Sequence, residues 1–171
     1  MAENKNNVTN LPGQALEIVV DDGSVEVPIR NKQGDTLGVF YFRPTDMGMI
    51  DRYNQLAGDF EKITAPLENL DINPDGSVDG DQAAEAAMQE AEQNLYAACD
   101  KLFGGNMAEA FFGKMHPFSP VGGRFYCENA LEAVGQYISR QFAREVKKVN
   151  SREEKYTHGY KTGKHKYGKR H

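Results

Sequence analysis

A change in the spacing of apolar residues near residue 44 is the feature that most constrains how this chain can fold. Between residues 15 and 43, apolar side chains alternate with polar ones, which is typical of half-buried β-strands. Between residues 45 and 149 they recur at intervals of three and four, the period of an amphipathic α-helix. Because strands and helices occupy separate blocks, the chain is predicted to be α+β.

The alternating block contains two turn-forming clusters that divide it into three predicted strands. The first cluster covers residues 21–24 and the second covers residues 31–35, and both are rich in Asp, Asn and Gly. The strands between them are expected at residues 16–20, 25–29 and 37–42. We therefore predict a small N-terminal antiparallel β-meander over residues 15–43.

The helical block, residues 45–149, is expected to hold three main α-helices and one short helix. Thr45 is the predicted N-cap of the first, which should fray or kink near Pro66, and the second should end at Gly104. A short helix over residues 107–112 and a packed loop rich in proline and glycine precede the last main helix. The prediction is one α+β domain over residues 15–149.

The two ends of the chain differ from this domain in composition and charge. Residues 1–14 are polar and are expected to be flexible. The 171-residue chain has a net charge of −5, but residues 150–171 hold seven Lys/Arg against two Asp/Glu, a net of +5, which leaves −10 for residues 1–149. We expect residues 150–171 to form a disordered basic tail on an acidic body.

Several functional classes find little support in the sequence. No stretch approaches the roughly 20 apolar residues needed to cross a bilayer, and residues 1–7 lack an apolar signal-peptide centre, so a cytoplasmic protein without a membrane partner is expected. Cys99 and Cys127 lack metal-ligand spacing and are predicted to be reduced core residues. His116 is expected to hydrogen-bond to backbone, and no motif combines a nucleophile with a base. We predict a non-enzymatic protein without a cofactor.

One loop follows the pattern of an EF-hand calcium site. Residues 71–82 place oxygen-bearing side chains at positions 1, 3, 5 and 9 and glycine at position 6. Position 12 is Gln82, although calcium needs a bidentate carboxylate there, and a turn followed by a helix N-cap explains the same residues without metal. A degenerate calcium-binding module remains one alternative, with these candidate ligands: Asp71, Asn73, Asp75, Ser77, Asp79 and Gln82.

The basic tail interleaves tyrosines with cations, a composition that can stack on bases and neutralise phosphates or dock on an acidic protein surface. The acidic body favours a protein partner, and a nucleic-acid-binding protein acting through the tail is a second alternative. The candidate contact residues of the tail are Lys155, Tyr156, Tyr160, Lys161, Lys164, Lys166, Tyr167, Lys169 and Arg170.

Three pairs of segments together resemble a known family. They are VEVPIRNKQG (25–34) with FRPTD (42–46), LFGGN (102–106) with PFSPVGG (117–123), and FYCE (125–128) with KYTH (155–158). Over roughly residues 15–160 the chain resembles the tail assembly chaperones of long-tailed phages of Gram-positive bacteria.

The resemblance implies a function without catalysis or cofactor. Such a chaperone binds the long, helix-rich tape measure protein in the host cytoplasm and keeps it soluble until tail tube subunits polymerise around it, so tape measure and tail tube proteins are the expected partners. The candidate contact residues in the glycine- and proline-rich segment are Phe111, Phe112, Met115, Phe118 and Phe125, and the alternative is that each is part of the protein's own core.

Overall fold

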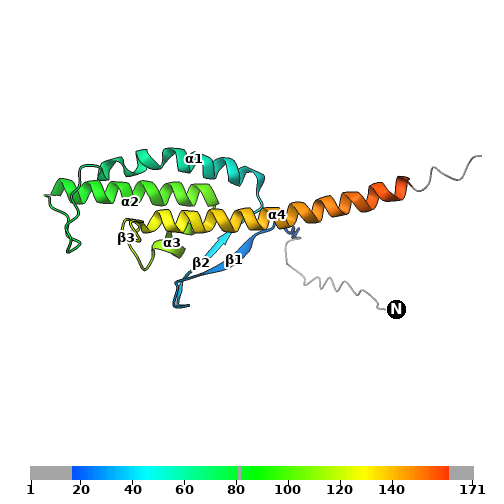
Figure 1. Ribbon diagram of the computed structural model, residues 1–171, viewed down its shortest axis with the longest axis horizontal. Helices are drawn as coiled ribbons and strands as arrows, with labels where there is room; N and C mark the ends of the chain where they lie inside the picture. Colours follow the sequence, from blue (N-terminus) through cyan, green and yellow to red (C-terminus); the bar gives the residue numbers. More distant parts are fainter. Residues whose placement is uncertain (1–16, 81, 162–171) are drawn as a thin grey trace, which may run out of the picture.

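The protein is an α+β structure, as predicted, with a two-stranded antiparallel hairpin followed by helices. The computed structural model describes residues 17–80 and 82–161, with side chains up to Arg152. Its elements are β1 (Val25–Arg30), β2 (Thr36–Phe42), α1 (Met47–Thr64), η1 (Ala65–Leu67), α2 (Gln82–Phe103), α3 (Met107–Phe112), β3 (Pro120–Val121), β4 (Arg124–Phe125) and α4 (Tyr126–Lys161). In Figure 1, α1, α2 and α4 run along the long axis of the body, and β1 and β2 lie below α4.

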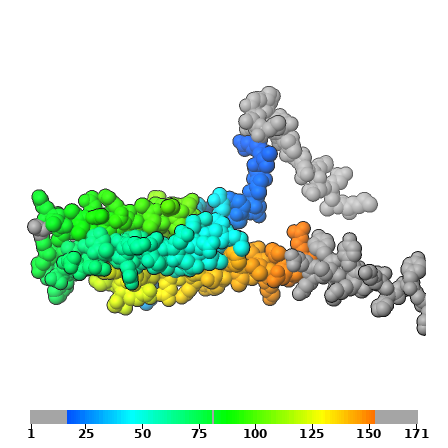
Figure 2. Space-filling model, turned by 90° about the horizontal axis from the view of Figure 1, so that it is seen from above, coloured from blue at the N-terminus to red at the C-terminus, as the bar shows by residue number. Residues whose placement is uncertain are grey.

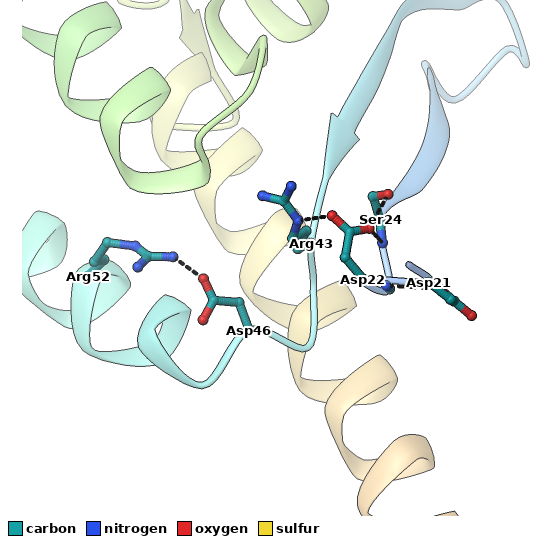
Figure 3. Close-up of polar contacts among 7 residues, drawn as sticks. Asp21, Asp22, Ser24, Arg43, Asp46 and Arg52 are labelled. Carbon is teal, nitrogen blue, oxygen red and sulfur yellow. Dashed lines mark hydrogen bonds and ion pairs between the residues drawn. The ribbon is translucent and has the colours of Figure 1, made fainter. Parts of the chain in front are cut away.

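The strand predicted at residues 16–20 is wrong, because residues 17–24 form no strand. Two Asx turns shape this segment: the backbone N–H of Gly23 donates to Asp21 and that of Ser24 donates to Asp22. The carboxylate of Asp22 also pairs with Arg43, beyond the end of β2 (Figure 3). The segment stands away from the body (Figure 2), so Ile18 and Val19 are 92% and 90% exposed.

The outer edge of β1 explains why no strand adds there. Backbone groups of Val39 and Tyr41 point at Asn106, away from β1, and Pro28 is the cross-strand partner of Val39. By the alternation of an antiparallel ladder, the nitrogen of Pro28 therefore lies on the outer edge of the hairpin. Proline has no N–H to donate, so an added strand would lose a ladder hydrogen bond at this position.

The outer edge of β2 is closed by one side chain. The amide of Asn106 accepts from the N–H of Tyr41 at 3.0 Å and donates to the carbonyl of Val39 at 2.9 Å, as a neighbouring strand would. Gly38 lets α3 approach closely, since a Cβ there would lie 2.4 Å from the carbonyl oxygen of Ala110. The start of α3 thus replaces a third strand.

The hairpin buries its inner face through stacked aromatic rings. Phe40 and Phe42 stack at 4.2 Å, and Phe40 meets the edges of Phe103 and Phe111 at 5.5 and 5.6 Å. Phe42 also contacts Tyr137 of α4 at 5.9 Å. The core therefore joins the hairpin to α2, α3 and α4.

The helix boundaries agree with the sequence at most positions. The 3-10 turn η1 contains Pro66, and α2 ends before Gly104, whose φ of 59° suits glycine. The N-cap of α1 is Asp46 and not Thr45, because the Asp46 carboxylate accepts from the N–H of Gly48. The proline- and glycine-rich loop includes the two-residue strands β3 and β4.

The largest difference lies at the end of α4, which continues to Lys161 and not to about residue 149. No proline interrupts residues 126–161, and the hydroxyl of Ser151 donates to the carbonyl of Lys147 within the helix. The first part of the predicted disordered tail is therefore helical. Residues 1–16 and 162–171, which include most of the predicted flexible ends, lie outside the described residues.

The closure of the β2 edge can be tested by replacing Asn106 with alanine. Both Tyr41 and Val39 lose a partner for a backbone group, so we expect the free energy of unfolding to fall by about 1–3 kcal/mol in urea titrations. The matched control is Asn94→Ala on the exposed face of α2, which should leave stability within about 0.5 kcal/mol of the parent. Equal effects of the two substitutions would show that Asn106 does not seal the edge.

The two cysteines are reduced and fully buried, as predicted, and burial raises the pKa of both thiols to about 12. Since the thiolate is the reactive form, Cys99 and Cys127 should resist thiol reagents at pH 8 until urea unfolds the chain. Ser139→Cys, at an exposed position of α4, is the control and should react at once. Rapid modification of native Cys99 or Cys127 would contradict the packed core.

Candidate protein-binding groove

An open groove of about 1190 Å³ lies between α1 and α4. We call it the α1/α4 groove and define it by residues of the two helices: Ile50, Tyr53 and Asn54 on α1, and Gly135, Ser139, Phe142, Ala143 and Val146 on α4. Most of these side chains are apolar or small. Figure 2 shows α1 in cyan beside α4 in yellow and orange.

Tyr53 joins the two sides of the groove. Its hydroxyl donates to the carbonyl of Leu131 at 3.0 Å, and burial raises the pKa of the phenol. Gly135 makes room for this contact, because a Cβ at that position would lie 2.7 Å from the Tyr53 hydroxyl oxygen. The separation of α1 and α4 is therefore set by a tyrosine that spans them and a glycine that accommodates it.

Small residues keep the α4 side of the groove shallow. Gly135, Ser139 and Ala143 follow one another at intervals of four and so lie on one face of the helix. A face of small residues lets a second helix approach closely. Phe142 and Val146 border this face and supply apolar surface.

Two ion pairs position the start of α1 (Figure 3). This end of the helix carries the exposed residues Met47 and Ile50. The guanidinium of Arg52 donates to Asp46 at 2.6 Å and, through Nε, to the carbonyl of Leu102 at 3.0 Å. The contact with Arg52 lowers the pKa of Asp46. Asp46 caps α1, Arg52 ties it to the end of α2, and the Arg43–Asp22 pair holds the chain just before it.

Beyond the groove, α4 continues past the rest of the body as the α4 extension, which we define as residues 147–161 (Figure 1). The apolar stripe of the helix continues onto it, since Val146 and Val149 are 42% and 57% exposed. Residues 140–152 hold five cations and one acid, Glu145: Arg140, Arg144, Lys147, Lys148 and Arg152. The helix therefore presents an apolar stripe with basic surroundings.

Most of the aromatic residues predicted to contact a partner belong to the protein's own core. Phe111, Phe112 and Phe118 are buried to 6% exposure or less, so they cannot form a partner surface in this conformation. Phe118 packs against the edge of Phe125, which is half-buried, at 5.5 Å. Of the five predicted contact residues in this segment, only Met115 is exposed, at 36%. The alternative, intramolecular core, holds for the three buried phenylalanines.

The loop at residues 71–79 uses its polar groups within itself. Asn73 donates to the Ser77 hydroxyl and to the carboxylate of Asp79 at 2.8 Å, and Asp75 accepts from both the N–H and hydroxyl of Ser77. Hydrogen bonds from Ser77 lower the pKa of Asp75. Among the described residues, no group of three His, Cys, Asp or Glu side chains could hold a metal ion. Gln82 is the first residue of α2, and Asp71 contributes its backbone carbonyl to the N–H of Asp79.

The remaining candidates lie apart from the groove or outside the description. His116 accepts from the N–H of Phe118 at 3.2 Å, so the predicted backbone hydrogen bond is confirmed. Four tail candidates belong to α4, although the structure does not describe their side chains: Lys155, Tyr156, Tyr160 and Lys161. The other tail candidates lie outside the described residues: Lys164, Lys166, Tyr167, Lys169 and Arg170.

The sequence did not reveal the groove, because the helical spacing that includes Phe142 and Val146 predicts a helix but not which part of its apolar stripe is covered. The available signal was the length of that stripe, which continues along α4 beyond the residues that have a partner in the body. Met47 and Ile50, at the start of α1, are apolar side chains that remain exposed.

The geometry of the groove predicts opposite effects of two glycine-to-alanine substitutions. Gly135→Ala should displace the Tyr53 hydroxyl and lower the free energy of unfolding by about 1–3 kcal/mol, since the hydrogen bond to Leu131 is lost. Gly58→Ala, in α1, meets no atom within 4 Å and should raise it by about 0.5–1 kcal/mol through helix propensity. Thermal and urea unfolding of both variants measures the difference. Stabilisation by both would mean that Tyr53 does not set the spacing.

Comparisons with protein-family models, with curated proteins and with solved structures found no match to this chain. Of the helices in the described part, none has both the length and the apolar character of a membrane span.

Proposed function

We propose that this protein is a non-enzymatic tail assembly chaperone that binds a helix of the tape measure protein in the α1/α4 groove. The observation that carries the proposal is a set of exposed apolar side chains that line the groove or lie one helical turn from a lining residue. Ile50 and Val146 are each 42% exposed, Val149 is 57% exposed, and Met47 is 74% exposed. An exposed apolar surface of this kind, bordered by polar residues, typically marks a site of protein interaction.

The shape of the groove suits a helix as the bound element. From Glu132 to Val146 the α4 side is 15 residues long, or about 22 Å at the rise of an α-helix. Helix-in-groove recognition uses an apolar face with anchors at intervals of three and four residues. A tape measure protein, by the resemblance of this chain to tail assembly chaperones, offers many such faces along its length.

Binding in this groove serves a chaperone because it is partial and reversible. The groove is open to solvent along its length and covers one face of a bound helix, so affinity is expected to be moderate. Tail tube protein, by covering the same apolar stripes on the tape measure protein, displaces the chaperone as the tube grows. The exchange needs no cofactor and takes place in the host cytoplasm.

The experiment that tests this proposal is co-expression with the tape measure protein of the same phage genome. We expect the tape measure protein to move from the insoluble to the soluble fraction and to co-purify with the chaperone. Val146→Asp and Ile50→Asp should each abolish the rescue, because a charge in the groove must be desolvated when a helix binds. The readout is the soluble fraction on a gel.

The matched control is Ile72→Asp, since Ile72 is also 42% exposed but lies in the 71–79 loop. It should preserve the rescue. If the tape measure protein remains insoluble with the parent chain, or if all three substitutions act alike, the groove does not perform this function.

A further inference from the structure

The α1/α4 groove is bordered by two cations, Arg140 and Lys147, for which the described part of the chain offers no acidic partner. We propose that the groove selects an amphipathic helix whose apolar stripe is flanked by acidic residues, an inference that rests on the proposed function and specifies its partner. The juxtaposition that carries it is the apolar floor of the groove beside Arg140 and Lys147 of α4.

The positions of the two cations match one flank of the groove. Arg140 lines the groove, and Lys147 follows seven residues later, two turns along the same side of α4. Small side chains at Ser139 and Ala143 separate them from the floor, so a docked helix can approach closely. Two acids seven residues apart on one flank of that helix would face Arg140 and Lys147 in one orientation of the bound helix, and acids on both flanks would do so in either orientation.

Several other cations of the described structure form ion pairs with acidic side chains. Arg43, Arg52 and Arg124 pair with Asp22, Asp46 and Glu132. In the described part of the chain, by contrast, no carboxylate lies within 4.0 Å of the charged groups of Arg140, Arg144 or Lys147. Glu145, the one acid of residues 140–152, forms an ion pair with Lys148 at 2.5 Å.

The α1 side leaves this positive charge uncompensated within the groove. Its lining residues, Ile50, Tyr53 and Asn54, carry no charge at neutral pH. Glu132, the only acid that lines the groove, is held by Arg124. A ligand with acids beside its apolar stripe therefore satisfies both the apolar and the charged surface, whereas a basic helix meets repulsion.

A second copy of this chain fits the groove less well. Its acid-rich helix α2 contributes none of the exposed large apolar side chains found among the described residues. The exposed stripe of α4 is itself surrounded by cations, so two copies paired through it would bring like charges together.

Nucleic acid also fits less well. Phosphates would meet the cations, but a nucleic acid would leave the apolar floor of the groove without a partner. Between Arg140 and Lys147 the groove offers Phe142, Ala143 and Val146, apolar surface that a phosphate backbone does not use.

The test uses three fluorescein-labelled 18-residue peptides with the same leucine stripe at helical spacing. Its flanking positions carry glutamate, glutamine or lysine. With the full chain in fluorescence anisotropy, we expect the glutamate peptide to bind at least about ten times more tightly than the lysine peptide, and the difference to shrink as salt rises. The glutamine peptide should fall between them.

Charge reversal locates the selectivity. Arg140→Glu combined with Lys147→Glu should reverse the order and make the lysine peptide the tighter ligand. The matched control is Lys32→Glu with Lys101→Glu, which changes net charge equally at exposed positions outside the groove and should keep the original order.

Equal binding of the three peptides, or an unchanged order after reversal at Arg140 and Lys147, would overturn the inference. Displacement of the glutamate peptide by single-stranded RNA would also overturn it, because nucleic acid would then be the occupant. A dimer, seen by light scattering, that dissociates when this peptide binds would overturn it as well, because a second copy of the chain would then be the occupant. Co-expression rescue without peptide selectivity would leave the chaperone proposal standing and remove this one. Peptide selectivity without co-expression rescue would remove the chaperone proposal and leave the preference for an acidic helix standing.

Discussion

The structure depends on how a two-stranded hairpin, which is marginal in water by itself, is stabilised by the helices around it. The start of α3 supplies two things at once: the amide of Asn106, which pairs with the open edge of β2, and the ring of Phe111, which packs on Phe40. The opposite edge is protected because Pro28 offers no N–H there. A hairpin sealed on both edges can serve as a platform for α2 and α4 without inviting a further strand.

The same packing decides which surface remains for partners. The aromatic residues near Gly104 and Pro117 pack against the hairpin and against one another, as in the pairs Phe40–Phe103 and Phe118–Phe125. Among the apolar side chains left exposed, Ile50 and Val146 lie at the groove, where Tyr53 sets the distance between α1 and α4. The candidate binding site is therefore a consequence of the spacing between α1 and α4 that Tyr53 and Gly135 set.

Charge acts on this arrangement at two levels. Ion pairs such as Asp46–Arg52 and Arg43–Asp22 lie where one element turns into the next and hold local geometry, although each is partly exposed and contributes modestly to stability. Arg140, Arg144 and Lys147 differ, because no carboxylate of the described residues pairs with them and their charge is available to a ligand. The acidic 71–79 loop shows the opposite case, in which polar side chains such as Asn73 and Ser77 satisfy one another within a turn.

The sequence by itself determined the α+β class, the α2 and α3 helices, the break at Pro66 and the buried, reduced cysteines, because each follows from local periodicity, capping residues or composition. It did not determine whether residues 16–20 form a strand, since the same β-branched pattern pairs only if an edge is open, and the edge of β1 is not. Nor could periodicity tell core from surface along α4: Ile138 and Val146 share one pattern, yet only Ile138 is covered. Tertiary structure decided both points, because burial depends on which neighbours reach a face, and that is a property of the assembled helices and not of any one segment.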